Sequence, residues 1–269
     1  MNENRYFKAG RFALVVKRDM AAGYRSILLT AVALGGVLFI LTFLTGIRPS
    51  GASVHPGIWT GFLMAGGFIT TSLMFKEMHS KERGHDWAML PASRLEMFVS
   101  RLILSSLGWI IGFTALYWAS SSLGEAVNRL VFGHGNALFN PFTRYTLEIA
   151  LHYFIIQSVF LLGAAYFRKA HFIKTILFIN VLNILLAALG LLLLKLFFWR
   201  VFTWDIFNEN GDFSSTMGWI NWDLVGQEAE QYFLAFARVM KIIYFSVFAP
   251  ILWVVAYFRV KEKEVRNGI

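Results

Sequence analysis

The chain has 269 residues, of which 57% are hydrophobic and 15% are charged. An ordinary soluble protein carries about 25% charged residues, so this composition excludes a soluble globular enzyme. The 27 Phe, 9 Trp and 9 Tyr residues provide more apolar surface than a water-soluble core of this length buries, and we expect the surplus to face a lipid bilayer. The net charge of +9 fits loops at an anionic membrane surface, and no nucleic-acid partner is expected. Without cysteine the chain has no disulfide, thiolate nucleophile or cysteine metal ligand.

The predicted fold class is an all-α polytopic membrane protein. A helix needs roughly 20 apolar residues to cross about 30 Å of hydrocarbon, and six apolar runs of about this length occur along the chain. They cover residues 27–46, 57–75, 97–118, 146–166, 175–199 and 239–258. We therefore expect a transmembrane domain of six helices over 27–258, preceded by a separate segment of 1–26 and followed by a basic tail of 259–269.

The distribution of Lys and Arg predicts the orientation. Six spans place both termini on one side, and that side would carry seventeen basic residues against five on the other. Because cytoplasmic loops are enriched in Lys and Arg, both termini are expected in the cytoplasm. The chain is thus predicted to be an integral membrane protein, expected in a bacterial cytoplasmic membrane.

The segment 1–26 has the pattern of an amphipathic helix at the cytoplasmic interface. At 100° per residue, one face is apolar and the opposite face is polar. The apolar face holds Tyr6, Phe12, Ala13, Val16, Met20 and Tyr24, and the polar face holds Lys8, Arg11, Arg18 and Asp19. Val15 and Lys17 interrupt the pattern, and the alternative is a solvated basic leader.

The longest predicted connections, 119–145 and 200–238, both lie on the outer side. The second combines many aromatic rings with acidic residues. Aromatic rings favour the membrane interface, so this segment is predicted to form short helices that dip into the outer interface. The alternative is a surface loop with an aromatic belt.

The connection 76–96 between the second and third spans is the most informative part of the sequence. Gly84 offers a helix stop, and Pro91 forbids a continuous helix through its position. Ser93 and Glu96 then form an S-x-x-E capping box directly before the third apolar run. Between these signals lies an exposed apolar patch that includes Trp87, which is costly unless it contacts a partner or lipid.

At these residues the sequence resembles the permease subunits of type-2 ABC exporters, in which a Glu and a Gly are followed by L-P-x-S-R-x-E before a span. The resemblance implies that 76–96 is a coupling helix that docks on an ATP-binding subunit, and that 200–238 corresponds to re-entrant outer helices. The family often has Lys at the position of Arg101. The alternative is that the motif only terminates and caps helices. The implied coupling residues are Glu77, Gly84, Trp87, Leu90, Pro91, Ser93, Arg94 and Glu96.

The resemblance also implies the partners and cofactors. No phosphate loop of the form G-x-x-x-x-G-K-[ST] occurs in the chain, so ATP and Mg²⁺ are expected in the separate ATP-binding subunit and no cofactor is expected in this chain. A second permease subunit, either a copy or a relative, would complete the dimer in the bilayer. The six His residues are scattered without recognised zinc spacing, so no metal is expected.

Polar side chains within the predicted spans are functional candidates, because they are expensive in hydrocarbon. The alternative is that they form hydrogen bonds between helices or lie at the interface. The candidates are Glu148, His152, Gln157, Asn180 and Asn183. A small-residue stripe at Gly57, Gly61 and Ala65 predicts a close helix approach in the second span.

The leading hypothesis is the permease subunit of an ATP-driven exporter that moves a hydrophobic or amphipathic substrate and performs no bond chemistry. Lipids, hydrophobic drugs, peptides and polysaccharide intermediates all fit such a composition. One alternative is a membrane scaffold or sensor that uses the same exposed patch. Another is an intramembrane enzyme, for which Glu148 and His152 on one helix face are the sole candidates.

Overall fold

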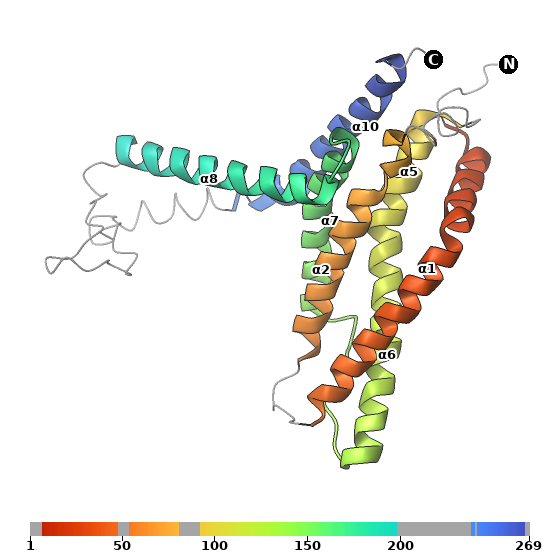
Figure 1. Cartoon of the computed structure of the whole chain (residues 1–269). Coiled ribbons are helices and arrows are strands. Elements are labelled where there is room, and N and C mark those ends of the chain that lie inside the picture. The colour runs from red at the N-terminus through yellow and green to blue at the C-terminus, as the bar shows by residue number, and fades with distance from the viewer. Residues whose placement is uncertain (1–6, 48–53, 81–91, 198–237, 240, 267–269) are drawn as a thin grey trace, which may run out of the picture. The chain divides into compact units, whose positions relative to one another are not determined.

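The computed structural model describes residues 7–47, 54–80, 92–197, 238–239 and 241–266. These described parts are helical and contain no strand. They divide into two compact units, Met1–Phe172 with Phe248–Ile269, and Ile173–Val247. The helices, in chain order, are α1 (Ala9–Thr45), α2 (His55–Leu73), α3 (Lys76–His79), α5 (Arg94–Ile103), the π-helix η1 (Leu104–Gly108), α6 (Trp109–Phe132), α7 (Arg144–Tyr166), α8 (His171–Phe197), the π-helix η3 (Tyr244–Phe248) and α10 (Ala249–Arg266) (Figure 1).

Five helices are long and apolar enough to cross a membrane. They coincide with five of the six predicted spans and confirm a helical protein with membrane-spanning segments. They are Ala9–Thr45, Arg94–Phe132, Arg144–Tyr166, His171–Gly190 and Lys241–Glu262. The remaining predicted span, 57–75, corresponds to α2, which ends at Leu73. That helix of 19 residues carries four Gly and three Thr, which dilute its apolar character, and it is not one of the five.

The N-terminal helix differs from its prediction. α1 is a single helix of 37 residues, so the boundary expected at residue 26 is not a helix end. Val15, which interrupts the amphipathic pattern, is buried in the first unit's core. The face predicted to be apolar lines an open groove with side chains that include Phe12, Val16 and Met20. α1 therefore directs Val15 toward the protein and this apolar stripe away from it.

The third span also extends beyond its predicted end at residue 118. α5, η1 and α6 form one continuous helix of 39 residues. It ends where Gly133 adopts the left-handed conformation, φ +73°, and donates its N–H to the Arg129 carbonyl. A glycine at this position is a common helix stop. The first half of the predicted outer connection 119–145, up to Phe132, is thus helical.

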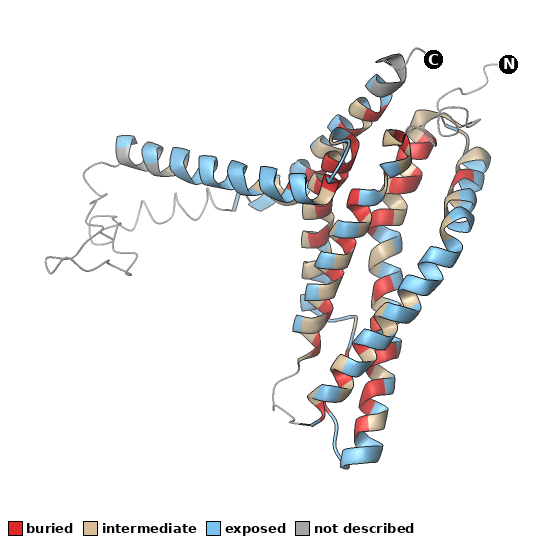
Figure 2. Ribbon diagram, viewed as in Figure 1, coloured by how far each residue is buried: buried red, intermediate tan, exposed pale blue. Residues whose placement is uncertain are grey.

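Two clusters of buried apolar side chains hold the first unit together. In this unit α1 packs along α6, and α7 packs against both α2 and α10. Figure 2 shows buried residues concentrated on the sides of α2, α6 and α7 that face their neighbours. One cluster centres on Phe75, Met97 and Phe98. The other centres on Trp59 and its neighbours, with Leu38, Leu63, Phe113, Tyr117, Phe139 and Tyr153.

Close helix packing uses different glycines from those predicted. A Cβ atom at Gly57 or Gly61 would meet no atom within 4 Å, so the predicted stripe is not a point of close approach within the described part of the chain. At Gly66 a Cβ would lie 2.7 Å from the Trp109 ring, and at Gly67 it would collide with Tyr153. These two glycines allow α2 to approach the aromatic side chains of α6 and α7.

The second unit contains most of α8, whose described side chains beyond Thr175 are almost all exposed. Asn180 and Asn183 are among the exposed residues. The predicted re-entrant segment 200–238 lies outside the described residues except for Arg238.

Candidate functional site

The predicted coupling segment 76–96 is described at its two ends. Gly84, Trp87, Leu90 and Pro91 lie outside the described residues. The capping box is confirmed. The Glu96 N–H donates to Ser93 Oγ at 3.1 Å, and the Ser93 N–H donates to Glu96 Oε2 at 2.8 Å.

The Glu96 carboxylate also binds the N-terminal segment. Its Oε1 atom accepts the Lys8 main-chain N–H at 2.7 Å and Arg11 Nη2 at 2.9 Å. The Glu96 side chain is fully buried, whereas that of Arg11 is 35% exposed. One turn further along α5 and about two turns further along α1, Ser100 Oγ donates to Asp19 Oδ2 at 3.1 Å. Polar residues of α1, predicted to face water, therefore bind α5 on either side of the buried Val15.

Arg101 ties the end of α2 to α5. Its Nη2 atom lies 2.9 Å from Glu77 Oε2, and its Nη1 atom donates to the Met74 carbonyl. The guanidinium carbon also lies 5.6 Å from the centre of the Phe75 ring, a distance typical of a cation–π contact. We call this region the Glu96 end, defined by Lys8, Arg11, Glu77, Glu96 and Arg101. There, α1 and the α2–α3 junction are both attached to α5.

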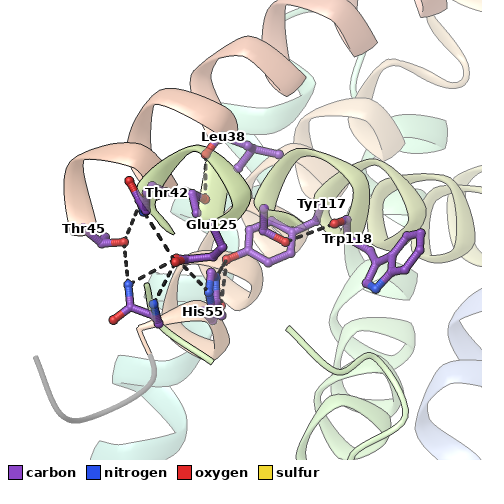
Figure 3. A network of polar contacts seen from close by, with 10 residues as sticks. Leu38, Thr42, Thr45, His55, Tyr117, Trp118 and Glu125 are labelled. Atoms are coloured by element: carbon purple, nitrogen blue, oxygen red, sulfur yellow. Dashed lines mark hydrogen bonds and ion pairs between the residues drawn. The ribbon is translucent and has the colours of Figure 1, made fainter. Parts of the chain in front are cut away.

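A second polar cluster lies where α1 ends, α2 begins and α6 ends (Figure 3). Its centre is Glu125 on α6, whose side chain is fully buried. Glu125 Oε2 accepts the Asn136 main-chain N–H at 2.8 Å, and Oε1 accepts Asn136 Nδ2 at 3.1 Å. His55 Nε2 lies 3.4 Å from Oε1. His55 Nδ1 in turn lies 3.0 Å from the hydroxyl of Tyr117.

Two amides extend this cluster to the last turn of α1. Asn128 Nδ2 donates to the Thr42 carbonyl at 3.1 Å, and Asn136 Nδ2 also contacts Thr45 Oγ1 at 3.1 Å. We call this region the Glu125 end, defined by Thr42, His55, Tyr117, Glu125, Asn128 and Asn136. It joins three helices and the chain that follows α6.

The sequence prediction missed the Glu125 end, because the span was expected to stop at residue 118 and Glu125 was assigned to a loop. A helical pattern was nevertheless present. Tyr117, Ser121, Glu125 and Asn128 recur at intervals of three or four residues, and all four are buried. Such a polar stripe on one helix face indicates contact with other polar groups inside the protein.

The two carboxylates stand at opposite ends of the same continuous helix. They are separated by 29 residues of the segment Arg94–Phe132. At about 1.5 Å per residue, Glu96 and Glu125 are roughly 43 Å apart along the axis. A bilayer with its headgroup regions is about 40–45 Å thick. The helix thus has the length to place one polar cluster in each headgroup region.

Of the polar candidates predicted within spans, Gln157 is brought into the interior. Its Nε2 atom donates to Ser105 Oγ in the π-helix η1 at 2.9 Å, and Tyr153 donates to the Ser105 carbonyl at 2.7 Å. Glu148 instead forms a 2.8 Å pair with the exposed Arg144. The His152 ring contacts the main-chain carbonyl of Glu148.

The two predicted asparagines of α8 belong to the second unit. Asn180 donates to the Ile176 carbonyl of its own helix at 2.9 Å, and Asn183 is exposed. Within the described ranges no three His, Asp or Glu side chains are grouped as a metal site would require. No family model, curated protein or solved structure matches the chain.

Proposed function

We propose that this chain is the membrane-spanning permease subunit of an ATP-driven ABC exporter. One observation carries the proposal. The capped start of α5 directly follows the predicted coupling segment, and it is attached to α1 through Glu96 and to the α2–α3 junction through Arg101. A subunit that pushed on this segment would therefore move three helices together.

The proposed mechanism begins with an ATP-binding subunit that docks on 76–96. Closure of two such subunits on ATP displaces this coupling segment, and the buried contacts of Glu96 transmit the displacement to α1. The continuous helix Arg94–Phe132 carries the displacement to the Glu125 end. ATP shifts the equilibrium because it binds the closed state more tightly than the open one. A hydrophobic or amphipathic substrate then passes between two permease subunits.

The proposal includes six spans, with α2 as the shortest. The Glu96 end lies in the cytoplasmic headgroup region and the Glu125 end in the outer one, which places both termini in the cytoplasm of a bacterial cell. This orientation is supported by the excess of Lys and Arg in the connections on the Glu96 side. The start of α1 lies in the cytoplasmic interface, where its outward apolar stripe meets lipid.

Co-purification tests this function. The tagged chain is isolated from native membranes in mild detergent, and the proteins that accompany it are identified by mass spectrometry. Three versions are compared: the wild type, Arg94→Glu at the start of α5, and Arg18→Glu at an exposed position of α1. Both variants reverse one positive charge, so Arg18→Glu is the matched control.

We expect an ATP-binding subunit with a phosphate loop to accompany the wild type and Arg18→Glu, and to be lost with Arg94→Glu. If no such subunit accompanies the wild type under conditions that preserve other membrane complexes, the proposed function is wrong.

A further inference from the structure

The Glu125 end contains a carboxylate and an imidazole that are both fully buried, at the junction of three helices. Burying an unpaired charge is expensive, so such a carboxylate requires either a positive partner or a proton of its own. Three donor groups of Asn128 and Asn136 surround Glu125, and all of them are neutral. His55 is the titratable group within ion-pair distance, with Nε2 at 3.4 Å from Oε1.

The hydrogen bonds of Tyr117 indicate where the His55 ring carries its first proton. The Tyr117 hydroxyl donates to the His55 main-chain carbonyl at 3.2 Å and lies 3.0 Å from Nδ1. A phenol has one hydrogen to donate. If that hydrogen binds the carbonyl, the hydroxyl oxygen must accept a hydrogen from Nδ1. In that arrangement the ring is protonated at Nδ1.

A second proton is then needed on the other side of the ring. Among the residues that the structure describes, His55 Nε2 has no hydrogen-bond partner apart from its approach to Glu125. With Nδ1 protonated, a neutral ring would present the lone pair of Nε2 to a carboxylate oxygen, which is repulsive. One proton between Nε2 and Oε1 removes the repulsion and makes the pair neutral overall, whichever of the two atoms holds it.

We propose that His55 and Glu125 together form a proton-binding site, and that the bound proton holds the ends of α1 and α2 against α6. Loss of this proton leaves a buried carboxylate opposite a lone pair and weakens the junction. The inference does not depend on the proposed transport function. It assigns to the Glu125 end a ligand, the proton, and a consequence of its release.

Three glycines allow the chain to pack closely around the His55–Glu125 pair. A Cβ at Gly124 would lie 2.9 Å from Thr42 Cβ, and a Cβ at Gly135 would lie 2.9 Å from Glu125 Oε2. A Cβ at Gly46 would collide with the side chain of Asn128. Glycine at these three positions lets the chain enclose the carboxylate.

Within the described residues, few other titratable or charged groups lie near the pair. On α6 they are Tyr117 and the exposed Arg129, whose Cγ lies 3.1 Å from where a Cβ of Gly135 would be. After α6, His134 stacks on Phe132 with ring centres 6.0 Å apart. α1 contributes Thr42 and Thr45, which do not titrate.

The proposal predicts the sign of a pH dependence. The folded pair holds one proton, whereas in the unfolded chain Glu125 is ionised and His55 loses its proton above its ordinary value of about 6.5. Above that pH the folded state binds more protons than the unfolded state, so stability falls as pH rises. The unfolding equilibrium constant should increase about tenfold per pH unit until the folded pair itself is deprotonated.

The predicted fall in stability with rising pH can be tested by unfolding the full chain in lipid nanodiscs from mildly acidic to alkaline pH. Glu125→Gln supplies an amide N–H to Nε2 and an amide oxygen to Asn136, so it imitates the protonated pair. We expect this variant to lose the alkaline decline in stability. The control Glu148→Gln removes an exposed carboxylate and should retain the decline. A decline that persists unchanged in Glu125→Gln would overturn the proposal.

Nitrogen-15 NMR of histidine-labelled wild-type chain gives a second readout if Glu125→Gln fails to fold. The His55 signal can be assigned through its contact with Tyr117. We expect Nε2 to be protonated or hydrogen-bonded through neutral pH. A bare Nε2 at neutral pH, as in a free neutral imidazole, would show that the pair holds no shared proton.

Discussion

Glu96 attaches the N-terminal segment to the start of α5, since its carboxylate accepts hydrogen bonds from Lys8, Arg11 and Ser93. Glu96→Ala would leave these donors without their acceptor, and hydrogen bonds to buried charged groups are worth more than neutral ones. We expect the free energy of unfolding in detergent micelles to fall by about 2 kcal/mol.

Glu148→Ala is the matched control for this loss. It also removes a carboxylate that is paired with Arg, but Arg144 is 91% exposed, and exposed pairs contribute at most about 1 kcal/mol. Equal losses in the two variants would mean that Glu96 is not a structural junction.

Gly67 and Gly61 lie on the same helix in different surroundings. An alanine Cβ at Gly67 would lie 2.7 Å from Trp109 Nε1 and collide with Tyr153, whereas at Gly61 it would meet nothing within 4 Å. Overpacking of this kind costs about 1–3 kcal/mol. We expect Gly67→Ala to lower the midpoint of thermal unfolding and Gly61→Ala to leave it unchanged or raise it. The reverse order would contradict the packing of α2.

At the residue scale, the sequence predicted only what depends on local spacing. The Ser93–Glu96 capping box was predictable because both partners lie within one turn. The burial of Glu125 was not predictable, because it depends on His55 and Asn136. His55 is distant along the chain, and Asn136 follows the end of α6, which the sequence prediction placed too early. The prediction of close helix packing at Gly57 and Gly61 was wrong for a related reason. Spacing identifies a helix face, but the neighbouring helix determines which face is packed.

At the scale of elements, apolar run length predicted five of the spanning helices correctly. It could not predict that α1 continues through residue 26, because Arg11 and Asp19, two of the charged residues that suggested a separate segment, are bound by α5. The paired face of α1 carries Arg11, Val15 and Asp19. The opposite stripe, which includes Met20, is left facing outward.

The outward stripe of α1 is expected to lie in lipid. Met20 is 53% exposed, and Arg18 is exposed at a different angle of the helix. Because the chain has no cysteine, Met20→Cys and Arg18→Cys can each carry a spin label without background. In nanodiscs, the label at 20 should be more accessible to oxygen, and the label at 18 to a water-soluble nickel chelate. Equal water accessibility at both positions would mean that this stripe does not contact the membrane.

At the scale of the whole molecule, the proposed topology places the connection 133–143 outside the cell and 167–170 inside. Leu138 and Lys169 are exposed positions in these two connections. We expect Leu138→Cys to react with a membrane-impermeant maleimide in intact cells. Lys169→Cys should react only after the membrane is permeabilised. Labelling of Lys169→Cys in intact cells would invert the orientation and remove the coupling segment from the cytoplasm.

Site-specific photo-cross-linking from the predicted coupling segment tests whether this segment docks on an ATP-binding subunit. A photoreactive amino acid replaces Trp87, with the same group at Leu138 as the control, and the chain is irradiated in native membranes. We predict that position 87 cross-links to an ATP-binding subunit that carries a phosphate loop, and that position 138 does not. If position 87 cross-links only to lipid, or to proteins without a nucleotide site, the chain is not the permease of an ABC exporter.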